Sequence, residues 1–134
     1  MSAYVTDTHA LIWHLTTDAQ LSPACRGIFE AADRGEATIW IPAIVLVETV
    51  YLAEKARFPS ALVTQMLDLV DPPSTGYTVA PLDAGVVRSL AAVNRSDVPD
   101  MPDRIVAATA LKLGLPLLTR DRKIRLALGP QAIW

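Results

Sequence analysis

The sequence lacks the features that define several large classes of protein. It has a single cysteine, Cys25, so no disulfide can form within the chain, which suits a reducing cytosol. Its densest apolar stretch, residues 39–47, is interrupted by Pro42 and falls far short of the roughly 20 residues that a membrane helix needs. No basic segment precedes an apolar stretch near Met1, so we expect no signal peptide. We therefore expect a cytoplasmic protein.

Charged residues are also scarce. Only 19% of the residues are charged and 51% are hydrophobic, a balance that excludes a disordered chain. No internal repeat or low-complexity segment divides the sequence. A length of 134 residues is enough to bury a core and favours a single domain over residues 1–134.

The charges that are present are unevenly distributed. Residues 1–100 hold 12 acidic and 6 basic residues, a balance of −6, whereas residues 101–134 hold 2 acidic and 6 basic residues, a balance of +4. The overall charge of −2 argues against a passive nucleic-acid coat. An acidic body with a basic last quarter could hold cations in one place and phosphates beside it. A solvated basic helix face explains the same distribution equally well.

Short β-like runs alternate with helical patterns along the whole chain. Ser22 and Pro23 begin one helix as N-cap and first residue, and Gly114 ends another. The predicted strands are residues 3–7, 37–41, 77–82, 115–119 and 131–134. The predicted helices are residues 8–15, 23–35, 43–57, 60–70, 83–95, 103–114 and 120–128.

This alternation predicts an α/β fold with three layers, in which helices cover both faces of a central, mostly parallel sheet. Sheets of this kind bind their ligands at the carboxyl ends of the strands, near the point where the strand order reverses. Asp7 ends the first predicted strand. We therefore expect its carboxylate at that edge of the sheet.

A second acid, Glu48, lies within the most apolar predicted helix. Helical spacing places it on one face with Ile44, Tyr51 and Leu52. Burial of an unpaired carboxylate costs several kcal/mol, so we expect Glu48 to have a cationic partner or a polar cavity. The alternative is that this helix face is simply exposed.

Two further acids, Asp103 and Asp121, lie next to predicted helix starts. Asp100 and Asp103 fit an N-cap and the third helical position, where acids are favoured by free amides and the helix dipole. Asp121 follows a buried strand and fits the N-cap of the last helix, as Asp7 fits that of the first. For each residue taken alone, the cap and a functional site remain open interpretations.

Taken together, the four acids predict a metal site. Close carboxylates repel by roughly 4 kcal/mol per pair at an intermediate dielectric constant, so such a cluster calls for a cation. Oxygen ligands alone favour Mg²⁺ or Mn²⁺. Zinc is disfavoured because His9 and His14 are five residues apart, on different sides of a helix, and Cys25 has no companion.

Four segments resemble, in order and spacing, the PIN-domain ribonucleases, and most of all the VapC-type toxins of toxin–antitoxin modules. These segments are VTDTHALIW, VETVYL, DMPDRIVAATA and LPLLTRD. The resemblance covers essentially the whole chain. It implies a PIN-like fold and an endoribonuclease that depends on Mg²⁺ or Mn²⁺. It also implies catalytic metal ligands at Asp7, Glu48, Asp103 and Asp121.

The resemblance extends to residues around that site. It implies an outer-shell role for Asp100, and hydroxyls at Thr8 and Thr119 that brace the carboxylates or hold water. The loop that leads into the sixth predicted helix differs from the family at residues 100–104. Related sequences often read Asp-Pro-Phe-Asp-Arg there, whereas this chain has DMPDR. The shape of this loop and its substrate contacts are therefore not carried over.

Cleavage by an activated water would leave a 5′-phosphate and need no histidine base. Four basic residues are candidates for contacts with flanking phosphates, and equally for plain surface charges: Arg104, Arg120, Arg122 and Lys123. The resemblance also implies a cognate antitoxin, an RNA substrate and a homodimer. Residues 61–70 are a candidate docking or dimer segment, although most of them are expected in the core of the domain.

Three other functions compete with this one. A metal-dependent DNA nuclease would use the same acids, since nothing in the sequence senses a 2′-hydroxyl. A Mg²⁺-binding phosphoacceptor signalling domain has a similar size, but the run around Asp7 lacks the paired acid that it needs. A PIN-like binding module without activity is less attractive because all four acids are present.

Overall fold

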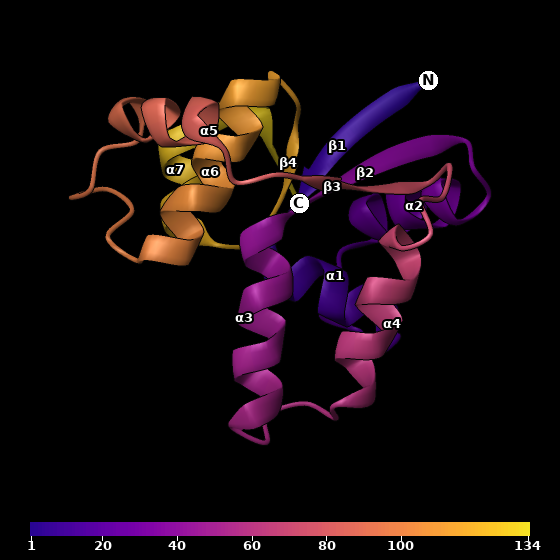
Figure 1. Cartoon of the computed structure of the whole chain (residues 1–134). Coiled ribbons are helices and arrows are strands. Elements are labelled where there is room, and N and C mark those ends of the chain that lie inside the picture. Colours follow the sequence, from indigo (N-terminus) through magenta and orange to yellow (C-terminus); the bar gives the residue numbers. More distant parts are fainter.

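A computed structural model describes all residues, Met1–Trp134, and contains five strands and seven α-helices (Figure 1). The strands are β1 (Ser2–Thr6), β2 (Ala37–Pro42), β3 (Tyr77–Ala80), β4 (Leu117–Leu118) and β5 (Ala132–Ile133). The helices are α1 (Thr8–Leu15), α2 (Pro23–Asp33), α3 (Ala43–Glu54), α4 (Ala61–Val70), α5 (Ala84–Ser89), α6 (Met101–Leu113) and α7 (Arg122–Leu128). Every predicted element is present.

The five strands form one sheet in the order β3-β2-β1-β4-β5, and every neighbouring pair is parallel. Strand β1 is central, because Val5 pairs with Trp40 of β2 on one side and with Leu117 of β4 on the other. The chain adds β2 and β3 on one side of β1 and then crosses to add β4 and β5 on the other. The strand order therefore reverses beside β1, as the predicted α/β fold requires.

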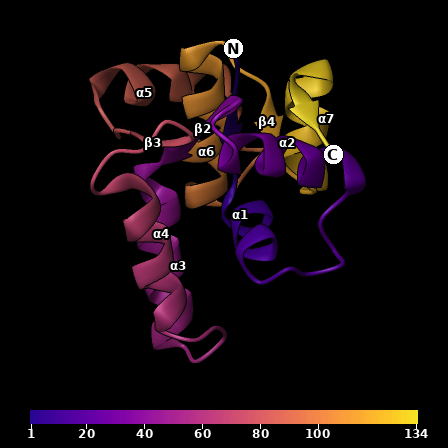
Figure 2. The same ribbon diagram turned by 90° about the vertical axis from the view of Figure 1, so that its right-hand side faces the viewer.

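Helices cover both faces of the sheet. Figures 1 and 2 show α1, α2 and α4 on one side and α5, α6 and α7 on the other, while α3 and α4 extend together beyond the carboxyl edge. A cluster of 28 buried hydrophobic residues fills the layers. Residues 105–110 of α6 are all buried, because Ala107, Ala108 and Ala110 let this helix pack closely against its neighbours. None of the helices has the length and apolar character to span a bilayer.

The helices begin within two residues of their predicted starts, whereas α5 ends six residues early and α3 three residues early. Helix α6 begins at Met101, two residues before the predicted start, because Asp100 caps it by accepting a hydrogen bond from the Asp103 N–H at 3.0 Å. Helix α5 ends at Ser89 and continues only as a 3₁₀ turn, Leu90–Ala92. The guanidinium of Arg104 donates to the carbonyls of Leu90 and Val93, each at 2.9 Å, and holds this turn.

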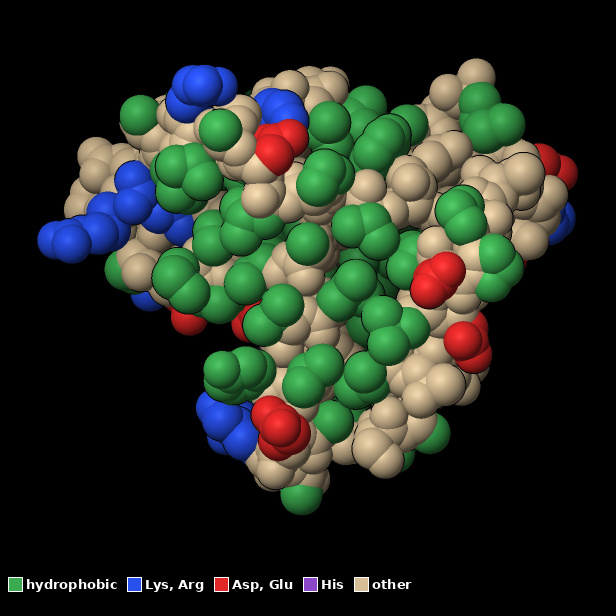
Figure 3. Space-filling model, in the orientation of Figure 1, with side chains coloured by type: hydrophobic (Ala, Val, Ile, Leu, Met, Phe, Trp, Pro, Cys, Tyr) green, Lys and Arg blue, Asp and Glu red, His purple; other side chains and the backbone are tan.

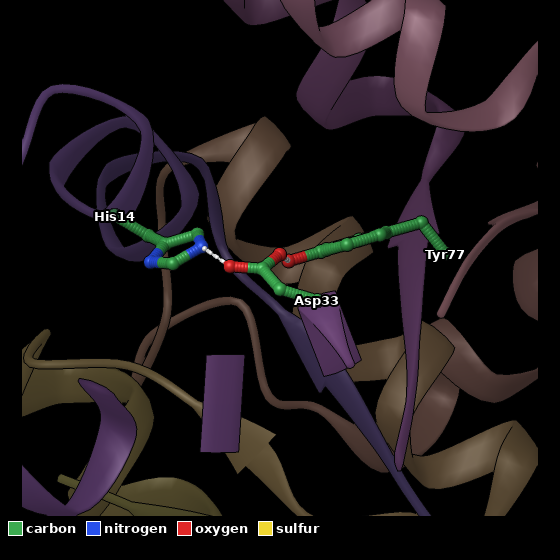
Figure 4. A network of polar contacts seen from close by, with 3 residues as sticks. All are labelled: His14, Asp33 and Tyr77. Carbon is green, nitrogen blue, oxygen red and sulfur yellow. Dashed lines mark hydrogen bonds and ion pairs between the residues drawn. The ribbon is translucent and has the colours of Figure 1, made fainter. Parts of the chain in front are cut away.

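Two contacts fix α2 against the sheet. Gly76 leads into β3, and a Cβ added there would lie 2.1 Å from the Ala32 carbonyl oxygen of α2, so only glycine fits. A polar network joins α1, α2 and β3 through Asp33, which accepts from the Tyr77 hydroxyl and contacts His14 Nε2 at 2.9 Å (Figure 4). Burial, and after it the Asp33 carboxylate, raise the pKa of Tyr77, so the phenol stays a donor.

Candidate active site at the carboxyl edge of the sheet

Asp7 stands where β1 meets α1 and is only 9% exposed. Its Oδ1 caps α1 by accepting a hydrogen bond from the Ala10 N–H at 2.8 Å. Burial raises the pKa of Asp7 to about 6, and the Thr119 hydroxyl and the Ala10 amide oppose this rise. The carboxylate is therefore held in place at the predicted edge of the sheet. The buried Thr119 lies beside it, in the position expected for a bracing residue.

The cap and site interpretations, which the sequence left open, are compatible in the structure. Asp121 caps α7 through a bond from the Ile124 N–H to Oδ1 at 2.9 Å, and Asp100 caps α6 in the same way. Each of these caps, like that of Asp7, uses Oδ1. The second oxygen of each carboxylate is left for another ligand.

Asp103 lies on the first turn of α6 and lines a hollow together with Asp7 and Asp121. Burial, followed by the negative charges of four neighbours, raises the pKa of Asp103 to about 7. These neighbours are Asp100, Asp121, Glu48 and Asp7. Asp7, Asp103 and Asp121 line one hollow, and Glu48 and Asp100 line another, so these carboxylates gather at one edge of the molecule although they come from distant parts of the sequence.

Glu48 is half-buried on α3, and its partner differs from the expected cation. Its Oε1 accepts a hydrogen bond from the Thr8 hydroxyl at 2.6 Å, and it forms no ion pair. Thr8 follows Asp7 directly, so this bond ties α3 to the start of α1. The carboxylate also lines a hollow of about 390 Å³ that it shares with Lys55 and Asp100. Glu48 therefore has a polar partner in Thr8, but neither the predicted cation nor a polar cavity, because apolar residues such as Ile44 and Leu52 form most of the lining of this hollow.

Two adjoining hollows share Asp103 and Asp121. One, of about 240 Å³, is lined by Asp7, His9, Trp13, Asp103, Arg120 and Asp121. The other, of about 250 Å³, is lined by Val98, Pro99, Asp100, Asp103, Asp121, Arg122 and Lys123. Three of the four candidate basic residues therefore border the acids. Arg104 does not, since its guanidinium is engaged with backbone carbonyls.

The donor set fits a hard divalent cation in its chemistry. The available groups are carboxylate oxygens, which are the ligands of Mg²⁺ and Mn²⁺. Burial and then the neighbouring negative charges raise the pKa of Asp103, and a bound cation would offset both effects. As the side chains stand, no three His, Cys, Asp or Glu residues are grouped closely enough to hold one ion. The metal site therefore stays a prediction.

Three residues of this region were not predicted from the sequence. His9 and Trp13 line the hollow with Asp7, and Gln20 reaches it through a hydrogen bond with Arg120. His9 and Trp13 are four residues apart on α1, a spacing that places both on one helix face and could have revealed them. No local pattern points to Gln20, because its partner is 100 residues away.

Comparison with known proteins agrees with the observed fold. The PIN domain family matches residues 4–127. Ribonuclease VapC22 of Mycobacterium tuberculosis is 26% identical over 133 residues, which are 99% of this chain and 98% of the relative. VapBC2 from Rickettsia felis, solved bound to a DNA fragment from its promoter, superposes with a TM-score of 0.67 at 18% identity, over 98% of this chain and 96% of that chain. A toxin–antitoxin complex from Klebsiella pneumoniae gives a TM-score of 0.66 at 20% identity, over the same shares of the two chains.

Proposed function

The chain belongs to the PIN domain family, and from this premise we propose that it is a metal-dependent endoribonuclease, the toxin of a toxin–antitoxin module. The observation that carries the nuclease activity is that Asp7, Asp103 and Asp121 line one hollow at the carboxyl edge of the sheet, with Asp100 in the adjoining hollow. A fold that needed these acids only as helix caps would have no reason to bring them together. The likeness to a curated ribonuclease over nearly the full length supports RNA as the substrate.

In this proposal Asp7, Glu48, Asp103 and Asp121 hold Mg²⁺ or Mn²⁺. A cation bound there would supply Lewis acidity, which lowers the pKa of a water and offsets charge on the scissile phosphate. The protein's part is to hold the ligands in place. The caps at Asp7 and Asp121 fix two carboxylates at strand ends, and the Thr8 hydroxyl fixes the carboxylate of Glu48.

The remaining residues around the hollows support the carboxylates or are placed to bind the RNA backbone. Thr119 braces the loop after β4, because its Oγ1 accepts a hydrogen bond from the Asp121 N–H at 3.0 Å. Asp100 shares a hollow with Asp103, which supports its outer-shell role. Arg122 and Lys123 line the same hollow and are placed to contact phosphates on one side of the scissile bond.

The antitoxin is proposed as the protein partner and a second copy of the chain as the dimer partner. The solved neighbours are toxin–antitoxin complexes, which supports the first proposal. Figure 3 shows hydrophobic side chains gathered over α3 and α4. This apolar face includes Val47, Val50 and Tyr51 of α3 and Leu67 of α4, which are 37–61% exposed. The predicted segment, residues 61–70, is divided, since Leu62 and Met66 pack in the core.

The test is cleavage of total RNA with Mn²⁺ by the wild type and by Asp7→Asn. Asparagine also caps helices, so α1 should be retained while one negative charge is lost. We expect cleavage to fall at least about 100-fold with the melting temperature unchanged or higher. Asp68→Asn, at an exposed site on α4, is the matched control and should cleave normally. Cleavage by folded Asp7→Asn at the wild-type rate would contradict the proposed role.

A further inference from the structure

Arg120 is held in a fixed position beside the acidic hollow. It lies in the turn between β4 and α7, next to Asp121. Its Cζ stands 4.5 Å from the centroid of the Trp13 ring, and its Nη1 donates to Gln20 Oε1 at 3.2 Å. A guanidinium stacked on an indole and hydrogen-bonded at one edge loses most of its rotational freedom.

The surroundings of Trp13 hold the stack itself in place. Trp13 is 7% exposed, and its ring meets the ring of Trp134 edge-on with centroids 5.8 Å apart. His9 packs against the same indole at 5.6 Å. The platform under Arg120 is therefore part of the packed core at the carboxyl edge of the sheet.

Arg120 lines the same hollow as Asp7, Asp103 and Asp121, yet it forms an ion pair with none of them. The stack on Trp13 and the bond to Gln20 keep the cation at the rim. Only one of its five N–H donors is used by the protein, and the residue is exposed. A desolvated acidic site would normally attract such a cation, so its separation leaves both the acids and the arginine free for ligands.

We propose that Arg120 binds an RNA phosphate that flanks the scissile bond, and that Trp13 and Gln20 are the residues that position it. A planar, bidentate donor set suits a phosphodiester, and stacking on Trp13 fixes the plane from which these donors project. Arg122 and Lys123 line the neighbouring hollow, so the strand would be held on both sides of the carboxylates. The identity of the ligand as RNA rests on the proposed function.

The test measures binding apart from cleavage. A fluorescein-labelled single-stranded RNA of mixed sequence is titrated in EDTA at several salt concentrations and followed by anisotropy. For Arg120→Gln we expect about tenfold weaker binding, and a slope of log K against log salt that is smaller by about 0.7. Arg88→Gln, which removes an exposed charge from α5, is the matched control and should keep the wild-type slope.

Three further variants test the positioning residues. Arg120→Lys keeps the charge but cannot stack flat, and we expect the wild-type salt slope with weaker binding. Gln20→Ala, in an exposed turn, and Trp13→Leu should weaken binding in the same way, with circular dichroism as the check on folding. If Arg120→Lys, Gln20→Ala and Trp13→Leu all bound like the wild type, the positioning role would be overturned.

The two proposals fail in different ways. If the wild type cleaves RNA but Arg120→Gln keeps the wild-type affinity and salt slope, the phosphate site is overturned and the nuclease stands. If the wild type cleaves no RNA but Arg120→Gln shows the expected loss, the phosphate site is supported and the proposed function is overturned.

Discussion

Individual carboxylates in this protein carry two roles at once. Asp7 and Asp121 each give one oxygen to a helix N-terminus and keep the other for the site. A cap needs only an acceptor, and asparagine or serine would provide one. The negative charge is the part that capping does not explain, and it has a measurable cost, because burial raises the pKa of Asp7 to about 6.

This cost should appear as a pH dependence of stability. The folded, metal-free protein binds protons more tightly than the unfolded chain, because the pKa rises from 3.8 to about 6 at Asp7 and to about 7 at Asp103. The free energy of unfolding should therefore fall as the pH rises from 4 to 7, by about 3 kcal/mol for a shift the size of that at Asp7. Urea denaturation in EDTA at pH 5 and pH 7.5 measures the part of this fall that lies above pH 5.

The sign of this dependence separates the site from ordinary surface carboxylates. Other shifted groups titrate outside the window, since the pKa of Asp83 is lowered and those of Cys25, Tyr77 and Arg34 are raised. Asp7→Asn should flatten the dependence, and Mn²⁺ should restore stability at pH 7.5 more than at pH 5. A wild type that became more stable from pH 5 to pH 7.5 in EDTA would contradict the raised pKa values.

The sequence predicted those candidate site residues that follow strands or interrupt apolar patterns. Asp7 and Asp121 were found at strand ends, and Glu48 by its place in an apolar helix. The contact between Gln20 and Arg120 could not be predicted, because it joins residues 100 positions apart across two loops. A pattern in a short stretch of sequence predicts the local helix or strand. It does not predict which side chains of a distant loop will contact that element.

At the scale of elements, alternating patterns were enough to predict each strand and helix, whereas the ends of the elements depended on tertiary contacts. The 3₁₀ turn after α5 is held by Arg104 from α6, a contact between separate segments. Strands β4 and β5 have only two residues each, shorter than predicted. Their flanking residues are apolar, and apolar character alone does not distinguish a strand from the loop beside it.

Replacement of two glycines by alanine should change the stability of the protein in opposite directions. At Gly76 a methyl group would meet the Ala32 carbonyl oxygen at 2.1 Å, so Gly76→Ala must push α2 away from β3 and should cost about 3 kcal/mol. At Gly27, within α2, nothing lies within 4 Å of an added Cβ. Gly27→Ala should therefore stabilise the protein by up to about 1 kcal/mol. Thermal unfolding of both variants tests the packing, and a tolerated Gly76→Ala would disprove it.

At the scale of the whole molecule, the strand order decides where the site forms. Because the chain builds outward from β1 in both directions, the ends of β1 and β4 meet where the order reverses, and Asp7 and Asp121 follow these two strands. The sequence predicted a parallel sheet but not its order. That order depends on which helices can pack on each face, a property of the assembled layers.

The apolar face on α3 and α4 leads to a prediction at the same scale. It encloses a hollow of about 150 Å³ lined only by hydrophobic residues, including Val47, Val50 and Leu67. If this face joins two copies of the chain, a charge at its centre should separate them. We expect a dimer for the wild type and a monomer for Leu67→Lys by light scattering after gel filtration.

The control for this experiment is Leu126→Lys, at a leucine that is 74% exposed on α7, outside the apolar face. This variant should keep the wild-type mass. A wild type that is monomeric at high concentration, or a Leu67→Lys variant that stays dimeric, would remove this face as the dimer contact.

If the chain is the toxin that we propose, the two roles of Asp7 and Asp121 also determine how its activity can be lost over generations. Most replacements of Asp7 discard the helix cap together with the charge, and their products are candidates for degradation. Asparagine, a single nucleotide away, discards only the charge. Inactive descendants that still fold, and still bind the proposed antitoxin, are therefore expected to carry asparagine at this position.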